Sequence, residues 1–245
     1  MKQLDWLIET PFAHRGLHDN REVPENTLLA IREAREQGFG SELDVWLTDD
    51  NRLIVHHDPT LKRTCGQKVR TTSIGGLDNY PIMQTQRTIP LLEQILIDTA
   101  GRVPLILEIK PTKRIEETCL AVAELLEKYP GHYAIESFQP AIVEWWIQNR
   151  PDAVVGQLYS ERAWIRWLSG ENKMTPKVDF FACPVNQLHR RPFTKMRKAY
   201  PTTPIIAWTM RTPKQLAQFM ILCDNYIFEC VDKNPSYIPL PTCTH

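Results

Sequence analysis

The chain has 245 residues, 42% of them hydrophobic, and its 29 basic and 29 acidic side chains give a formal net charge of zero. This length allows a large core in one or two domains, and because barrels of about 250 residues often form one domain, we expect one over residues 1–245. The balanced charge argues against a nucleic-acid partner and against attraction to an anionic membrane surface.

The N-terminal segment predicts no targeting signal. Residues 1–10 carry Asp5 and Glu9 and lack both a basic region and a long apolar run, unlike a signal peptide. No apolar run approaches the roughly 20 residues of a membrane-spanning helix. The six cysteines show no C-x-x-C pair and no zinc-type spacing, so we expect reduced thiols. We therefore predict a soluble, cytoplasmic protein without stable membrane insertion, and no oligomeric state follows from the pattern.

Apolar runs of strand length alternate along the chain with segments of helical periodicity. The first strand is predicted at residues 11–13 and ends at His14, and a helix follows at residues 27–37. Residues 41–47 and 53–55 are both extended and flank a turn-like sequence, so they form either a hairpin or one bent strand. The chain thus begins with a strand-to-helix step and a second strand.

The polar stretch 60–86 interrupts this rhythm. It is too long for an ordinary connection, and we interpret it as a small insertion over one mouth of the fold, between the second strand and the following helix. Further strands are predicted at residues 103–109, 133–138, 153–159, 178–183, 204–209 and 226–229. Helices are predicted at residues 91–99, 115–129, 163–168, 192–200 and 213–223, and one more begins at Pro140.

Eight strand-to-helix steps favour an α/β fold of the (β/α)8 TIM barrel type over an open, doubly wound sheet. In such a barrel the strand ends converge on one face, where barrel enzymes have their active sites. The predicted strand ends are His14, Glu42, Glu108, Ser137, Leu158, Cys183, Trp208 and Glu229. Several of them are charged or carry an imidazole, which indicates an active site.

Three of these side chains are carboxylates that form a candidate metal site. Glu42, Asp44 and Glu108 supply hard oxygen ligands without the cysteines or multiple histidines typical of zinc, which favours one divalent cation, Mg²⁺ or Ca²⁺. Glu42 and Asp44 share one face of their strand because side chains alternate with a period of two. Each carboxylate alone is more often a solvated charge, and it is their co-occurrence at successive strands that supports a site.

Two histidines are candidates for proton transfer. With ordinary pKa values of about 6.5, His14 and His57 can serve as general acid and general base at the same pH. Alternation lets only one of His56 and His57 face the site, and we assign the chemistry to His57. Asp58 either orients a neighbour, which we favour, or caps the following turn.

Other residues suit a phosphate ligand and its organic part. Arg15 offers a planar fork of donors for phosphate oxygens, and Lys110 adds a point charge beside the metal. Trp208 and Phe138 form either an apolar wall for a glycerol moiety or ordinary barrel packing. For Asn26 we favour a helix-capping role over substrate contact.

Four short motifs follow one another in the first quarter of the chain. They are His14-Arg15-Gly16, Pro24-Glu25-Asn26-Thr27, Glu42-Leu43-Asp44-Val45 and His57-Asp58. In order and spacing the chain resembles the glycerophosphodiester phosphodiesterase family, whose N-terminal motifs are H-R-G, P-E-N-T, E-x-D-V and H-D. The similarity continues through Leu61-Lys62-Arg63-Thr64, Ile89-Pro90-Leu91-Leu92-Glu93, Glu108-Ile109-Lys110, Ser137-Phe138 and Ala207-Trp208-Thr209. It therefore covers nearly the whole chain.

The resemblance implies a TIM barrel with a small insertion and hydrolysis of a small-molecule glycerophosphodiester to glycerol 3-phosphate and an alcohol. It further implies a divalent cation on Glu42, Asp44 and Glu108, with His14 and His57 as the acid and base. Arg15 and Lys110 would bind the phosphate. Lysophospholipids are an alternative substrate class, and a non-catalytic phosphate-binding barrel is the rival from another class.

Two departures from the family pattern limit what is carried over. In place of the family's closing T-D-x-P, the chain has residues 228–235, so neither Glu229 nor Asp232 receives a family role. The insertion is poorly matched after Gly66, which leaves open how the alcohol side of the substrate is bound.

Overall fold

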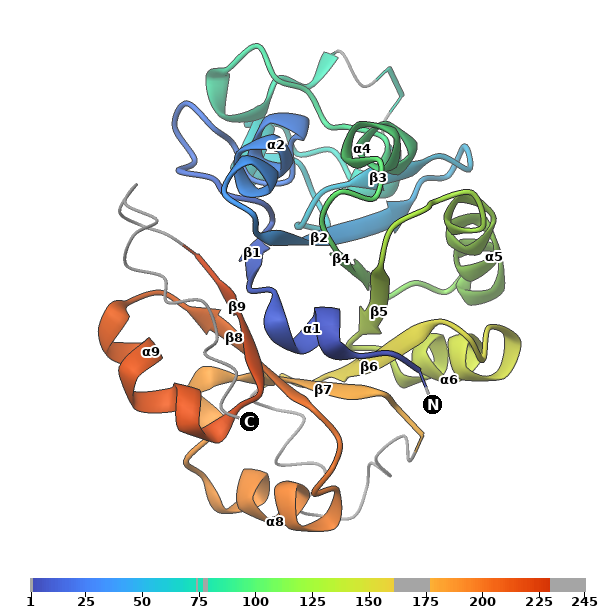
Figure 1. Cartoon of the computed structure of the whole chain (residues 1–245). Coiled ribbons are helices and arrows are strands. Elements are labelled where there is room, and N and C mark those ends of the chain that lie inside the picture. Colours follow the sequence, from blue (N-terminus) through green and yellow to red (C-terminus); the bar gives the residue numbers. More distant parts are fainter. Residues whose placement is uncertain (1, 74, 77–78, 161–176, 230–245) are drawn as a thin grey trace.

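A computed structural model describes residues 2–73, 75–76, 79–160 and 177–229. Among these, β1 pairs in parallel with both β2 and β9, so eight parallel strands close into a barrel (Figure 1). This confirms the predicted TIM barrel. The strands are β1 (Phe12–His14), β2 (Gly40–Leu47), β3 (Leu53–Val55), β4 (Leu105–Ile109), β5 (Tyr133–Ser137), β6 (Val154–Leu158), β7 (Phe180–Pro184), β8 (Ile205–Met210) and β9 (Asn225–Phe228).

Strand β3 lies outside the barrel. It runs antiparallel to the end of β2, with Val45 paired to Val55 and Leu47 to Leu53. Of the two alternatives left open by the sequence, the hairpin is therefore correct. Since β2 extends beyond the barrel to make this hairpin, Glu42 and Asp44 lie in its middle rather than at its end.

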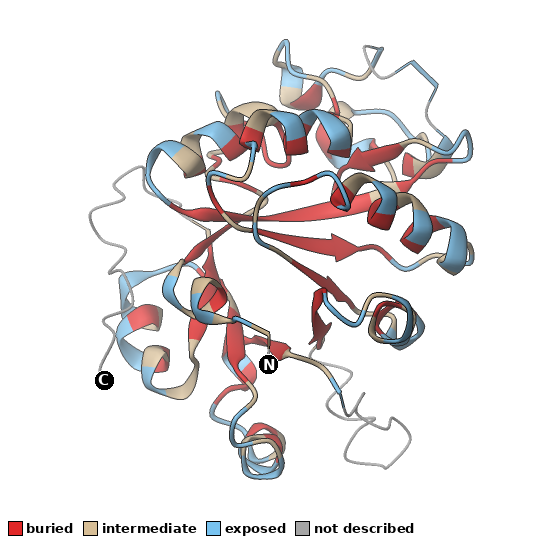
Figure 2. Ribbon diagram, turned by 45° about the vertical axis from the view of Figure 1, so that its right-hand side comes forward, coloured by how far each residue is buried: buried red, intermediate tan, exposed pale blue. Residues whose placement is uncertain are grey.

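Helices surround the ring of strands, with their exposed faces outward and their buried faces against the barrel (Figure 2). They are α1 (Asp5–Glu9), α2 (Leu28–Glu36), α3 (Lys62–Cys65), α4 (Leu92–Thr99), α5 (Ile115–Leu126), α6 (Pro140–Asn149), α8 (Arg191–Ala199) and α9 (Pro213–Phe219). Short 3-10 helices cover Thr71–Ser73, Ile82–Gln84, Val185–Gln187 and Met220–Leu222. The helix predicted at residues 163–168 and the position of Asp232 lie outside the described residues.

Helix α1, which the sequence analysis did not predict, closes the amino-terminal end of the barrel. Figure 1 shows it across the middle of the ring. Its Leu7 is fully buried among interior side chains that include Phe12, Ile106 and Phe180. The Asn225 amide at the start of β9 donates hydrogen bonds to the Leu7 and Thr10 carbonyls. A five-residue helix with one buried residue carries too little periodicity to be recognised from sequence.

Side-chain alternation explains why the site residues converge. Phe12 and Ile106 fill the barrel interior on the side of helix α1. Two residues further along the same strands, the same inward direction is taken by His14 and Glu108. The amino-terminal half of the barrel interior is therefore filled with apolar side chains, and the carboxyl-terminal half, which we call the mouth, is lined by polar ones.

The stretch 60–86 lies between β3 and α4 and has its own small apolar cluster. Leu61 and Ile82 are buried there against Ile54 of β3 and Ile89. Helix α3 places Arg63 of this stretch at the carboxyl-terminal mouth of the barrel, as its contacts below show. Nowhere in the described ranges is a helix both apolar enough and long enough to span a membrane.

Candidate active site

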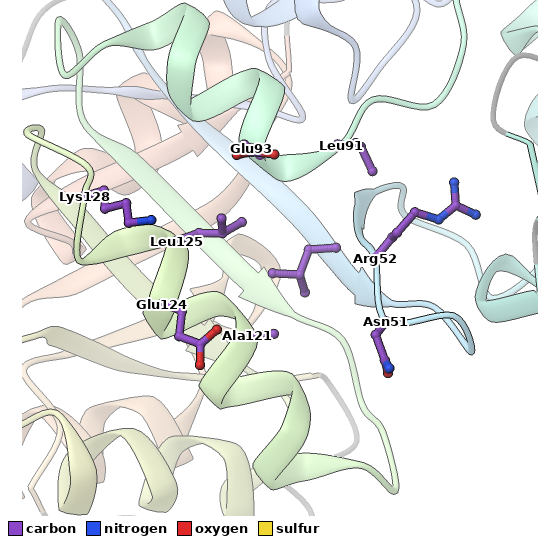
Figure 3. A pocket seen from close by; sticks show the side chains of 9 residues that line it. Asn51, Arg52, Leu91, Glu93, Ala121, Glu124, Leu125 and Lys128 are labelled. Carbon is purple, nitrogen blue, oxygen red and sulfur yellow. The ribbon is translucent and has the colours of Figure 1, made fainter.

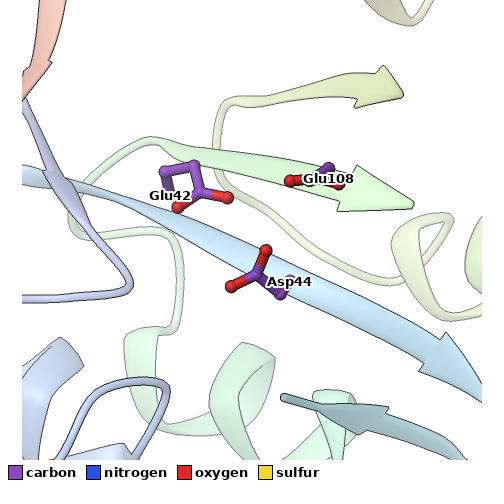
Figure 4. Close-up of side chains that lie close together, drawn as sticks. All are labelled: Glu42, Asp44 and Glu108. Atoms are coloured by element: carbon purple, nitrogen blue, oxygen red, sulfur yellow. The ribbon is translucent and has the colours of Figure 1, made fainter. Parts of the chain in front are cut away.

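A cluster of buried carboxylates occupies neighbouring strands inside the barrel mouth. Glu42 and Asp44 come from β2 and Glu108 from β4, where Asp44 and Glu108 are register partners. Each of the three offers an oxygen within 4.8 Å of the others (Figure 4). A fourth, Glu136 of β5, is the register partner of Glu108 on the other side. The structure thus brings together the three predicted ligands and adds an acid that the sequence analysis missed.

Two cations lie against this cluster. Lys110 Nζ is 2.5 Å from Asp44 Oδ1 and 2.8 Å from Glu108 Oε2, and Arg15 Nε is 3.3 Å from Asp44 Oδ2. Burial alone would raise the pKa of Asp44, but Lys110 and Arg15 hold it well below its usual value. Asp44 is therefore ionised at neutral pH.

The remaining acids are crowded. Burial, followed by the neighbouring carboxylates, raises the pKa of both Glu42 and Glu136 well above the usual value. Burial also raises the pKa of Glu108 to about 7, although Lys110 opposes it. If all four carboxylates were ionised, Arg15 and Lys110 would leave two negative charges uncompensated. A divalent cation supplies that balance.

The donor set fits Mg²⁺ or Ca²⁺. The ligand atoms of the cluster are all carboxylate oxygens, which hard divalent cations prefer. Glu108 Oε1 is buried and has no hydrogen-bond partner. Because a buried carboxylate oxygen without a donor is costly, this atom is available for a cation.

His14 lies at the end of β1 and is held by a carboxylate. Its Nδ1 donates to Glu229 Oε2 at 3.3 Å, and its Nε2 is 3.9 Å from Glu42 Oε2. Glu229 directly follows β9 and also pairs with Arg211 at 2.9 Å. Burial lowers the pKa of His14 to about 4 despite Glu229, and the hydrogen bond with His14 lowers the pKa of Glu229 to about 2.

His57 has a similar arrangement. Its Nδ1 donates to Asp58 Oδ1 at 2.6 Å, and Asp58 Oδ2 accepts from Arg63 Nε at 2.6 Å. Asp58 thus orients its neighbour, as favoured from the sequence. Burial lowers the pKa of His57, although its side chain is 35% exposed. His56 faces the insertion instead, where its Nε2 lies 2.8 Å from Thr64 Oγ1.

Glu25 connects the two sides of the mouth. This buried carboxylate is 2.8 Å from Arg15 Nη1 and 2.6 Å from Arg63 Nη2. Although burial opposes it, the hydrogen bond from Arg63 and the charge of Arg15 lower the pKa of Glu25 far below its usual value. Glu25 therefore connects Arg15, which lies beside Asp44, with Arg63, which lies beside Asp58.

The capping role expected for Asn26 is wrong. Thr27 is the N-cap of α2, since its hydroxyl accepts from the Ala30 N–H. Asn26 precedes the cap with a left-handed φ of 56°, and its Nδ2 donates to Asp44 Oδ2 at 2.7 Å. The backbone turn directs this amide into the barrel, and it holds a candidate metal ligand.

A cavity of about 170 Å³ opens at this mouth between the acid cluster and an apolar wall. Phe138 and Trp208 form part of the wall and make an edge-to-face contact, with ring centroids 5.9 Å apart. Both rings also pack against the inner barrel cluster, so they line the cavity and contribute to packing. The lining includes His14, Arg15, Glu42, His57, Glu108, Glu136, Phe138, Leu158, Trp208, Thr209 and Arg211.

A larger cavity, of about 340 Å³, lies outside the barrel between the β2–β3 hairpin, α4 and α5 (Figure 3). Its lining combines aliphatic and charged side chains, without histidine. It lies away from the inward-facing strand residues, whereas the mouth cavity collects acids, bases and aromatic rings. We therefore place the active site in the smaller cavity. The outer cavity is lined by Asn51, Arg52, Leu53, Leu91, Glu93, Ala121, Glu124, Leu125 and Lys128.

Sequence reasoning missed the cavity residues Glu136 and Arg211 and left Glu229 without a role. Glu136 precedes Phe138 by two residues and shares its strand face, so alternation was a signal that would have found it. Pairing of Glu229 with His14 arises only when β9 closes onto β1, and no local pattern predicts it.

Comparisons with known proteins agree with this geometry. The sequence profile of the Glycerophosphoryl diester phosphodiesterase family matches residues 14–226. A glycerophosphodiester phosphodiesterase from Bacillus altitudinis is 40% identical over 100 residues, and the match covers 35% of this chain and 38% of that relative. The chain thus spans well under two thirds of that relative's length.

Solved structures share the fold. A phosphodiesterase from Oleispira antarctica, in complex with the product sn-glycerol-3-phosphate, has a TM-score of 0.74 at 22% identity, covering 90% of this chain and 92% of its own. A glycerophosphodiester phosphodiesterase from Thermotoga maritima has a TM-score of 0.71 at 22% identity, covering 89% and 94%. At these identities the likeness establishes the barrel architecture.

Proposed function

The chain belongs to the glycerophosphoryl diester phosphodiesterase family, and we propose that it hydrolyses glycerophosphodiesters to glycerol 3-phosphate and an alcohol. The observation that carries this proposal is the pairing of two histidines with a buried carboxylate cluster around one cavity. A phosphate-binding protein needs cations around its ligand, but it has no need for an acid and a base with carboxylate partners.

In this proposal Glu42, Asp44 and Glu108 hold one Mg²⁺ or Ca²⁺. When bound, the cation supplies Lewis-acid polarisation of the phosphoryl group. Asn26 and Lys110 fix the orientation of Asp44 through the contacts at 2.7 and 2.5 Å, so the ligand set is held before a cation arrives.

His14 and His57 are the proton-transfer pair. Because the Nδ1 atom of each imidazole is bound to a carboxylate, the Nε2 atom remains for chemistry. One histidine removes the proton of the attacking hydroxyl, and the other donates a proton to the departing alkoxide oxygen. The attacking group is water or, as the family resemblance implies, the neighbouring glycerol hydroxyl, which would give a cyclic phosphate that water then opens.

Arg15 and Lys110 carry the positive charge for the phosphate. Arg15 lines the cavity, whereas Lys110 lies between Asp44 and Glu108 and acts on the phosphate through its charge. Phe138 and Trp208 contact the organic part of the substrate. The cytoplasmic location expected from the sequence stays a prediction.

The lysophospholipid alternative has less support. It requires an apolar groove for an acyl chain, for which the sequence offers Trp145, Trp146, Trp164 and Trp167, and the two that the structure describes do not form one. Trp146 is buried between α6 and the barrel, and Trp145 packs against the same cluster. Trp164 and Trp167 lie outside the described residues.

The test is the release of glycerol 3-phosphate from glycerophosphocholine by the purified protein, with Mg²⁺, with Ca²⁺ and with chelator. We expect turnover with a divalent cation and none with chelator. Glu108→Gln should abolish the metal response, while Glu93→Gln on the outer surface of α4 should behave like the wild type. Absence of turnover on any glycerophosphodiester with either cation would refute the proposal.

A further inference from the structure

Glu136 is a buried acid that the proposed mechanism does not use. Its side chain is 1% exposed, and it lines the cavity from β5. It is not part of the group of three whose oxygens lie within 4.8 Å of one another. It stands one strand further along, between Glu108 on β4 and Gly156 on β6, its register partners.

Among the described residues, Glu136 Oε2 is buried without a hydrogen-bond partner. The cations nearby are engaged elsewhere: Lys110 pairs with Asp44 and Glu108, and Arg211 pairs with Glu229. Since an unsatisfied buried oxygen is unfavourable, a hydrogen bond from a bound ligand would remove that unfavourable contribution.

The position of Glu136 indicates which part of a ligand reaches it. Glu108 on one side belongs to the candidate metal site, where the phosphate binds in our proposal. Phe138 follows two residues later on the same strand face, and Leu158 of β6 lines the same wall. Glu136 is therefore the acceptor on the wall facing the organic group attached to the phosphate.

We propose that Glu136 accepts a hydrogen bond from the terminal hydroxyl of the substrate's glycerol and so selects diesters with a free glycerol over their acylated counterparts. This inference rests on the proposed function. Glycerol is common to the whole substrate class, and its hydroxyls can pair with a buried carboxyl oxygen that has no other partner. A trimethylammonium head group has no N–H to donate.

Acylation of that hydroxyl removes the interaction. The ester has no hydroxyl at this position, so Glu136 Oε2 stays buried without a partner. A site that hydrogen-bonds a substrate hydroxyl rejects an analogue without it, because the buried partner stays unpaired. The proposal thus explains how the same catalytic groups would act on glycerophosphodiesters and discriminate against lysophospholipids.

The test measures binding of two phosphates by isothermal titration in the presence of Mg²⁺ or Ca²⁺. The probes are sn-glycerol 3-phosphate and propane-1,2-diol 1-phosphate, which lacks only the terminal hydroxyl. We expect the wild type to bind the first roughly 10- to 100-fold more tightly. Glu136→Met, which has no carboxylate and a similar volume, should reduce this ratio to near one. Glu136→Gln retains one acceptor oxygen and should keep part of the preference for sn-glycerol 3-phosphate.

Controls separate this role from others. Leu158→Met changes the same wall without changing an acceptor, and it should leave the affinity ratio as in the wild type. Replacing a buried carboxyl group whose Oε2 has no partner does not remove a stabilising contact, so both Glu136 variants are expected to fold, which a thermal melt verifies. If Glu136→Met and Glu136→Gln weaken the binding of both phosphates equally, Glu136 serves charge balance and the proposal is overturned.

The proposed function is followed in parallel by turnover of glycerophosphocholine and of short-chain 1-acyl lysophosphatidylcholine. Turnover of both diesters at similar kcat/KM by the wild type would overturn the selectivity role and leave the hydrolase function standing. Failure to turn over any diester would instead overturn the function on which the inference rests.

Discussion

The two histidines of the mouth are held by similar groups that come from different distances in the chain. In what we call the His57 arm, Asp58 is the next residue and Arg63 follows five residues later. In the His14 arm, Glu229 and Arg211 come from the far end of the chain. Both arms have the order histidine, carboxylate, arginine. The same chemical arrangement is thus built once by local sequence and once by barrel closure.

The arms also differ in strength. The His57–Asp58 contact is 2.6 Å, whereas the His14–Glu229 contact is 3.3 Å. Arg63 continues to the buried Glu25 and from there to Arg15, while Arg211 is half exposed. The local arm is therefore part of a connected ion network, and the nonlocal arm ends near solvent.

Replacing either histidine should have the largest effect. His14→Ala and His57→Ala each remove a proton-transfer group, and each should lower kcat on glycerophosphocholine by roughly 10²–10⁴-fold. Both variants should keep the circular dichroism spectrum of the wild type, because neither side chain contributes to the apolar core. Full activity in one of these variants would show that its histidine takes no part in proton transfer, so the two arms would not have equivalent roles.

The carboxylate partners come next. Asp58→Asn and Glu229→Gln leave each imidazole without its charged acceptor, and partners of this kind typically contribute about 10–100-fold. We expect the loss in kcat rather than in KM, since neither carboxylate lines the cavity as a ligand contact. The shorter contact of Asp58 predicts the larger loss. Unchanged kcat in Glu229→Gln would show that the nonlocal arm is only a structural contact.

The arginines should differ in stability more than in activity. Arg63→Met leaves the buried Glu25 with one cationic partner fewer, at a cost of about 1–3 kcal/mol in the free energy of unfolding. The partner of Arg211 is Glu229, which is 25% exposed where Glu25 is 3% exposed, so Arg211→Met should change that free energy by less than about 1 kcal/mol. Urea unfolding of both variants checks the difference. Equal losses in the free energy of unfolding would mean that the contact of Arg63 with Glu25 adds no stability to the His57 arm beyond that of the His14 arm.

The same contrast shows what sequence could predict. The sequence predicted the barrel and offered the β2–β3 hairpin as one of two alternatives. It also predicted most of the side chains that point into the mouth. These predictions rest on side-chain alternation and on strand ends, which are local signals. Asp58 was interpreted correctly as an orienting residue for the same reason. Glu229 received no role, since its partner lies 215 positions away.

Two misses have other causes. Asn26 has the composition of a helix cap, but a left-handed backbone turns its amide toward Asp44, and Thr27 takes the cap. Glu136 received no role because Ser137 is the predicted end of this strand. The alternation that placed Phe138 in the cavity applies equally to the residue two positions earlier.

Acid titration gives the smallest expected effect and compares the carboxylates directly. The pKa of Glu229, about 2 in the folded protein and 4.5 ordinarily, is depressed mainly by the hydrogen bond from His14. A depressed carboxylate stabilises the fold above its unfolded pKa, and this contribution is lost as pH falls toward the folded value.

Glu229→Gln removes that titration, so the wild type should be the more stable protein near neutral pH and should lose its advantage between pH of about 5 and about 2. Because Glu229 is 25% exposed, we expect an advantage of about 1 kcal/mol, or about 2–4 °C in Tm. Glu229 also raises the pKa of His14, so the measured difference reports the His14–Glu229 pair rather than Glu229 alone. As a control, Glu127→Gln removes an exposed surface partner of Arg150 and should show little dependence on pH. A Tm difference between wild type and Glu229→Gln that stays constant from pH 7 to pH 3 would mean that the His14 arm carries no ionised carboxylate, and the likeness of the two arms would fail.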